Sequence, residues 1–68
     1  MKTFKLVSYA NIREILEDLP NEFKINLIES DEFQRLRIID FFAGLAYREG
    51  SMKKINAHEY IITLKGAK

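Results

Sequence analysis

The sequence predicts one small α/β domain, a two-layer α+β sandwich in which two helices lie on one face of a four-stranded mixed sheet. Three observations predict this fold: short segments of alternating apolar and polar residues, two intervening segments with helical apolar spacing, and a length of 68 residues, which suits a single domain over 1–68. The predicted order is β-α-β-α-β-β. The strand–helix–strand unit implies a right-handed crossover between parallel strands, and the last two strands form a hairpin.

The first half of the chain supplies a strand, a helix and a second strand. Residues 3–7 alternate and predict the first strand, and Ser8 is a candidate N-cap for the helix that follows. That helix ends at Pro20, which cannot continue a helix. Residues 23–28 alternate again and predict the second strand. The helix carries one narrow apolar stripe: Ile12, Ile15, Leu16 and Leu19.

The second helix has clear start and stop signals. Either Ser30 or Asp31 caps it, and Asp31 and Gln34 have the spacing of a capping box. We expect the helix to run to about Arg48, with Gly50 placed to terminate it.

The predicted hairpin pairs residues 52–55 with residues 59–64 through a short turn at 56–58. Alternation along the strands divides the apolar residues between two faces. The face expected to meet the helices carries Phe4, Leu6, Phe23, Ile25, Leu27, Tyr60, Ile62 and Leu64. The open face is expected to mix Val7, Ile28, Ile55, Ile61 and Thr63 with Lys5, Lys24 and Asn26, which is too apolar for a contiguous patch in water.

The second helix has more apolar surface than one sheet face covers. At about 100° per residue, its apolar residues span an arc of roughly 240°. They are Leu36, Ile38, Ile39, Phe41, Phe42, Ala43, Leu45, Ala46 and Tyr47. Either the first helix covers the remainder or another chain does. Gly44 is either a tolerated surface glycine or a point where another chain approaches the backbone, so we expect self-association through the open sheet face, this helix or both.

Composition argues against several function classes. The chain has no cysteine and one histidine, which excludes disulfides and thiolate metal sites, and we expect no metal or cofactor. The net charge of the chain is +1, so the chain as a whole lacks the strong excess of basic residues that is typical of nucleic-acid-binding proteins. The C-terminal third is nevertheless basic and suits an acidic partner, with nucleic-acid binding a weak alternative. Its lysines are Lys53, Lys54, Lys65 and Lys68.

Catalytic constellations are hard to find. His58 falls in the predicted hairpin turn, where we expect it to be exposed to solvent. Asp40 has Arg37 one helical turn before it, a spacing that predicts a surface ion pair. A lone carboxylate is no acid/base pair, so we expect the chain not to be an enzyme.

Residues 37–44, which read Arg-Ile-Ile-Asp-Phe-Phe-Ala-Gly and are followed by Tyr47 and Gly50, resemble the signature of the SepF family. SepF proteins are bacterial and archaeal cell-division proteins that tether the tubulin-like FtsZ. The resemblance runs from about Ser8 to Thr63 and includes the strand at 23–27. It departs from the family pattern at three places: Glu49-Gly50 replaces a double glycine, Asn56 replaces a glycine, and Leu64 replaces a proline.

The resemblance implies a homodimer that can assemble further and that binds the short, apolar and charged C-terminal tail of FtsZ. By position, Lys54 and Tyr60 match the basic and aromatic residues of the family's hairpin that we associate with tail binding. Phe41, Gly44 and Tyr47 match the helix that helps form contacts between chains. Tyr60 could equally be a core residue, and Lys54 could be a solvated strand lysine.

The resemblance also implies a cytoplasmic location at the division site. Family members carry an N-terminal amphipathic membrane-binding helix, whereas this chain begins at the first strand. Either that segment is missing from this sequence or the chain is a soluble stand-alone relative, so we expect membrane contact only through a segment absent from this chain. The alternative function is a small-molecule-sensing or regulatory α/β domain, because folds of this size host many functions. A deep pocket with convergent polar groups would favour that alternative.

Overall fold

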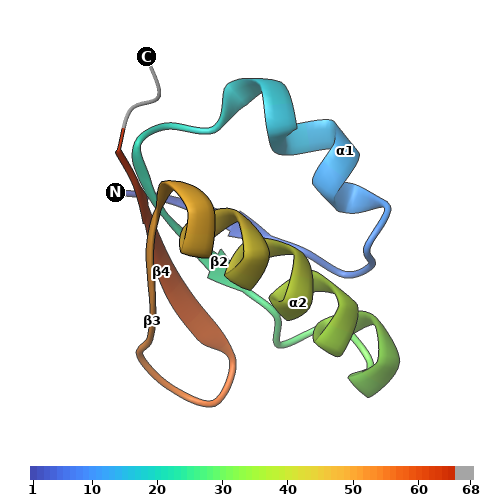
Figure 1. Ribbon diagram of the computed structural model, residues 1–68. Helices are drawn as coiled ribbons and strands as arrows, with labels where there is room; N and C mark the ends of the chain where they lie inside the picture. Colours follow the sequence, from blue (N-terminus) through green and yellow to red (C-terminus); the bar gives the residue numbers. More distant parts are fainter. Residues whose placement is uncertain (66–68) are drawn as a thin grey trace.

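The computed structural model describes residues 1–65 and has the predicted order of elements (Figure 1). The elements are β1 (Lys2–Lys5), α1 (Asn11–Ile15), the short 3-10 helix η1 (Leu16–Asp18), β2 (Glu22–Asn26), α2 (Glu32–Glu49), β3 (Gly50–Lys54) and β4 (Glu59–Leu64). The four strands form one mixed sheet in the order β1-β2-β4-β3. β1 and β2 are parallel, and the other two pairs are antiparallel. The predicted α+β sandwich is therefore confirmed.

The apolar core lies between the sheet and the two helices, and Figure 1 shows α2 crossing the sheet. Phe23 of β2 is at its centre, with its ring 5.7 Å from that of Phe4 and 5.8 Å from that of Phe42, both edge-to-face. The buried cluster is Leu6, Ile12, Phe23, Ile25, Leu27, Ile38, Phe42 and Ile62. Every residue predicted to face the helices belongs to this cluster or packs against it, so that prediction is confirmed.

The first strand ends earlier than predicted, at Lys5. The side-chain oxygen of Asn11 accepts hydrogen bonds from the backbone N–H groups of Val7 and Ser8, both at 2.9 Å. These two amides are thereby turned away from the sheet. The prediction that Ser8 caps the first helix is wrong, because that helix begins at Asn11 and its N-cap, Ala10, makes no side-chain bond.

The first helix is also shorter than its apolar stripe. It tightens into η1 after Ile15, and Leu19 is already extended, with φ −71° and ψ 121°. The residue before a proline is disfavoured in the helical region, so Pro20 acts one position upstream. Within the stripe, Ile12 is buried, whereas Leu16 is 43% exposed.

The second helix starts as predicted, and Asp31 is its cap. The Asp31 carboxylate accepts the backbone N–H of Gln34 at 2.8 Å. The Gln34 side chain does not complete a capping box, because its oxygen accepts the backbone N–H of Tyr9 at 2.8 Å instead. Gln34 thus connects α2 to the segment that precedes α1.

The open face of the sheet is more polar than predicted. Within the strands Ile61 is its only large apolar residue, and its ladder partners on the two sides are Lys24 and Lys53. Val7 and Ile28 fall beyond the strand ends, as does Ile55. The strands of the open sheet face therefore carry less apolar surface than predicted, and self-association through this face stays a prediction.

Candidate functional site

A groove lies between α2 and the β3–β4 hairpin; we call it the α2–hairpin groove. Its volume is about 460 Å³. Its lining residues are Ile39, Ala43, Ala46, Tyr47, Gly50, Ser51, Met52, Lys54 and Tyr60. The groove therefore contains both residues that the sequence assigned to partner binding, and one of the three that it assigned to self-association.

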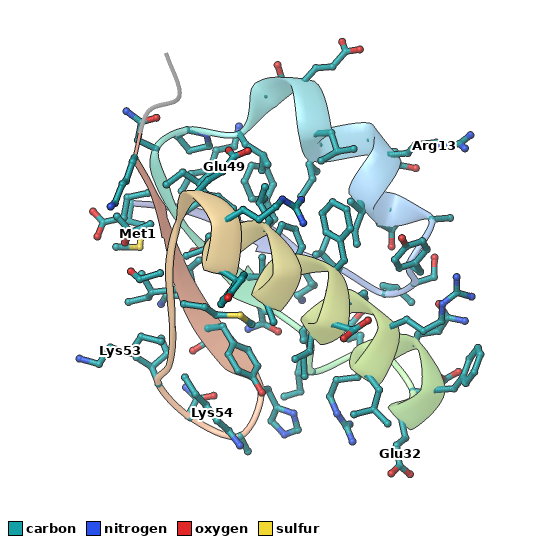
Figure 2. All side chains as sticks on the ribbon, in the orientation of Figure 1. Met1, Arg13, Glu32, Glu49, Lys53 and Lys54 are labelled. Atoms are coloured by element: carbon teal, nitrogen blue, oxygen red, sulfur yellow. The ribbon has the colours of Figure 1, made fainter. Side chains whose placement is uncertain are left out.

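Lys54 and Tyr60 are direct cross-strand partners in the β3–β4 ladder. Lys54 is exposed near the end of the hairpin, and Figure 2 shows Lys53 extending away from the sheet on the other side. Tyr60 is half-buried: it packs against the core and also lines the groove, so its core position leaves part of the side chain facing the groove. Tyr47 is 91% exposed on the helical side of the groove.

Phe41 and Gly44 do not line this groove. The Phe41 ring is half-buried, 5.1 Å from the Phe42 ring and 6.2 Å from the Tyr9 ring. At Gly44 a Cβ would meet only the end of the Arg48 side chain, at 3.8 Å. Nothing within residues 1–65 therefore requires glycine at this position.

One side of α2 carries large apolar residues that α1 does not cover. Phe33 is 65% exposed and Leu36 57% exposed, and Ala43 and Tyr47 continue the same side. We call Phe33, Leu36, Ala43 and Tyr47 the α2 outer stripe. The first helix therefore leaves this part of the surplus apolar arc uncovered, and coverage by another chain stays a prediction.

A second groove lies between α1 and α2, and we call it the α1–α2 groove. Its volume is about 590 Å³. Its lining residues are Ser8, Tyr9, Ala10, Ile12, Arg13, Leu16, Gln34, Arg37 and Phe41. Sequence reasoning missed this groove, because its two walls are distant in the chain and no local pattern joins them.

Arg37 does not pair with Asp40, so the predicted ion pair is wrong. The Arg37 guanidinium lies over the Tyr9 ring, 4.4 Å from its centroid, and 5.7 Å from that of Phe33. The one ion pair within residues 1–65 joins Lys5 to Glu29 at 3.4 Å, and both side chains are largely exposed. Stacking on an aromatic ring occupies the face of the guanidinium and leaves its N–H edge available.

Glu59 organises the hairpin turn. Its carboxylate accepts hydrogen bonds from the side-chain amides of Asn26 and Asn56, both at 2.8 Å. The Asn56 bond, followed by the Asn26 bond, lowers the pKa of Glu59 below its ordinary value. His58, expected to be exposed, is half-buried, and its Nδ1 atom is buried without a hydrogen-bond partner in the described structure. The expectation for His58 was wrong because Asn56 folds the turn back and accepts its N–H.

Residues 1–65 carry neither a cluster of metal ligands nor a long apolar helix. No group of three or more His, Cys, Asp or Glu in this part of the chain could hold a metal ion. No helix there combines the length and apolar character that crossing a bilayer requires. Lys68, part of the basic C-terminal third, lies outside the described residues.

The chain matches no protein-family model, and a search of curated proteins returns no match. The resemblance to SepF therefore stays a prediction that depends on the residues quoted for it.

Proposed function

We propose that this chain is a non-enzymatic adaptor domain of cell division that dimerises, assembles further and binds the C-terminal tail of FtsZ, in the cytoplasm at the division site. The observation that carries the proposal is the α2–hairpin groove, which brings together Lys54, Tyr60 and Tyr47. These residues come from three elements, and the resemblance had already assigned each of them to a contact with another chain.

The chemistry of the groove suits a short peptide that is both apolar and charged. Its floor is apolar, formed by side chains such as Ala46 and Met52, and Lys54 lies at its end by the hairpin turn. Apolar anchors on the peptide would pack on the floor beside Tyr47, and an acidic side chain would meet the Lys54 ammonium. Aromatic residues such as tyrosine supply large contact area at interfaces.

The α2 outer stripe supports dimerisation. Phe33 and Leu36 are large side chains in water, and burying each against a second copy would gain roughly 1.5–3 kcal/mol. A core of this size rarely supplies more than about 3–5 kcal/mol of stability alone. A dimer through the Phe33–Leu36 end of the stripe would therefore stabilise the domain and leave Tyr47 available to the groove.

The tail proposal is tested by titrating a fluorescently labelled FtsZ C-terminal peptide with the protein and measuring anisotropy. We expect micromolar binding that Lys54→Glu weakens about tenfold or more, because the charge at the groove is reversed. Lys53→Glu is the matched control: it makes the same charge change on the neighbouring residue, which faces the open side of the sheet (Figure 2). Equal losses in the two variants would mean a net-charge effect and would contradict the groove.

Dimerisation is tested separately by sedimentation velocity over a range of concentrations. We expect Leu36→Glu to make the protein monomeric, because it places a charge in the α2 outer stripe. Val7→Glu is the control, since Val7 is also exposed, at 46%, but lies in the β1–α1 connection and is not part of the α2 outer stripe. A wild-type protein that stays monomeric at high micromolar concentration would refute this part of the proposal.

A further inference from the structure

The α1–α2 groove has a size and lining that differ from those of the α2–hairpin groove. Its volume of about 590 Å³ falls within the roughly 300–1,000 Å³ of small-molecule sites. Tyr9 and Phe41 form an aromatic wall, and Ile12 and Leu16 form an aliphatic one. A flat apolar molecule would therefore find contact on two sides.

The charge in this groove has one sign. Arg13 and Arg37 line it, and none of its lining residues is acidic. Figure 2 shows the Arg13 side chain extending from α1 into solvent, whereas the guanidinium of Arg37, although that residue is exposed, lies against the Tyr9 ring of the groove. Arg37 forms no ion pair with any carboxylate of residues 1–65. A guanidinium that is stacked on an aromatic ring and has no counter-ion can still pair with an anion of complementary shape, even where it is exposed.

The guanidinium of Arg37 is held in place before any ligand arrives. Tyr9 lies under its face at 4.4 Å, and Tyr9 is fixed in turn because its backbone N–H donates to the Gln34 side-chain oxygen at 2.8 Å. That bond uses the Gln34 oxygen and leaves its NH₂ group free to donate. Arg37 and Gln34, one helical turn apart on α2, thus both carry N–H donors in the lining of the groove.

We infer that the α1–α2 groove binds a small organic anion with a flat apolar body, such as an aromatic carboxylate. The carboxylate accepts hydrogen bonds from the N–H edge of Arg37 and from the Gln34 amide, and the body packs between Phe41 and Leu16. This site is separate from the α2–hairpin groove, so the inference does not depend on the binding of an FtsZ tail. It gives the chain a ligand-sensing capacity in addition to its adaptor role.

Asp40 places a negative charge close to Arg37, and its removal tests whether charge controls binding in the groove. Together with Tyr9, Arg37 and Phe41 it lines a smaller hollow of about 280 Å³ next to the groove. Its carboxylate competes with a bound anion for the field of Arg37, although it forms no ion pair with it. Removing that charge by Asp40→Asn should tighten anion binding severalfold. If Asp40 only stabilised the fold, the same substitution would leave anion binding unchanged or weaken it.

The experiment is an NMR titration of the ¹⁵N-labelled protein with 1-naphthoate and with its neutral analogue 1-naphthamide. We expect naphthoate to shift the backbone amides of Tyr9, Arg13 and Gln34, and to bind about tenfold more tightly than naphthamide. Arg37→Gln should abolish this preference while leaving naphthamide binding unchanged. Arg48→Gln, a matched change at an exposed arginine of the same helix, should leave the preference intact.

Three outcomes would overturn the inference. Equal affinities for naphthoate and naphthamide would show that the groove does not recognise charge. Shifts centred on Lys54 and Tyr60 would move the site to the α2–hairpin groove. Perturbation of the groove amides by raising the protein concentration alone, without a probe, would place a second copy of the chain there.

Discussion

Gly50 packs directly against the backbone of Thr63, so closely that a Cβ at residue 50 would overlap the Thr63 carbonyl oxygen. Its φ of 178° is extended, so the glycine is required by this close approach and not by a left-handed conformation. The prediction that Gly50 ends the second helix is met, since it is the C-cap residue, but its special role is to let β3 start at once beside β4.

Gly50→Ala should therefore destabilise the domain. Inserting a methyl group against backbone forces the strands apart, and overpacking of this kind costs about 1–3 kcal/mol. The measurement is urea unfolding followed by far-UV circular dichroism. Unchanged stability would show that β3 can shift away from Thr63 without loss of pairing.

Gly44→Ala is the contrasting glycine substitution, because a Cβ there has only an ordinary 3.8 Å contact with the end of a flexible arginine. We expect a gain of about 0.5–1 kcal/mol from the better helix propensity of alanine. Unfolding should be measured at a concentration where the protein is monomeric. A loss of stability confined to higher concentrations would place residue 44 at a chain–chain contact.

Asn11→Ala should cost about 1–2 kcal/mol, because the Asn11 side-chain oxygen is the acceptor for two backbone amides, those of Val7 and Ser8. Asn11→Asp is the control, since it keeps an acceptor oxygen in the same place and should retain most of the stability. Thermal unfolding of the three proteins side by side tests this. Equal losses in both variants would assign the effect to the Asn11 NH₂ group instead.

Glu59 should make stability depend on acidic pH. Its pKa is lowered in the folded protein by the amides of Asn56 and Asn26, so the unfolded state binds the proton more tightly. The stabilisation is complete above the pKa of an unfolded glutamate, about 4.3. It is lost as the pH falls through the lower pKa of the folded state.

The matching variant is Glu59→Gln, which should lower stability at pH 7 and flatten the decline between about pH 5 and pH 3. Glu22→Gln, at an exposed position of β2 for which no side-chain hydrogen bond is found, is the control and should keep the decline. Urea unfolding across this pH range distinguishes them. If the stability of Glu59→Gln depended on pH as that of the wild type does, Glu59 would not be the source of the pH dependence.

The element order and the core-facing residues could be predicted because each depends on a local pattern. Alternation identified Phe23 and Ile25 as helix-facing, and Asp31 capped α2 through a contact three residues away. Predictions failed where a distant or competing side chain intervened. Asn11 ended β1 early, and the stacking of Arg37 on Tyr9 replaced its expected pairing with Asp40.

Three residues that line the α2–hairpin groove were singled out from the sequence, but the groove itself was not predicted. Lys54, Tyr60 and Tyr47 were each singled out, and the structure places them around one groove, whereas Phe41 packs on the opposite flank of α2 beside Tyr9. The α1–α2 groove had no counterpart in the sequence reasoning, because Tyr9, Gln34 and Arg37 meet only after the helices dock.

Periodicity, capping residues and Pro20 were enough to specify the strands, the helices and the apolar face of each, since these features act over a few residues of chain. Tertiary structure decided the strand ends, the polarity of the open sheet face, the need for glycine at residue 50 and both grooves. Each of these depends on groups far apart in the chain, such as Gly50 and Thr63 or Tyr9 and Arg37. Only packing brings such groups within contact distance, so no local rule could have paired them.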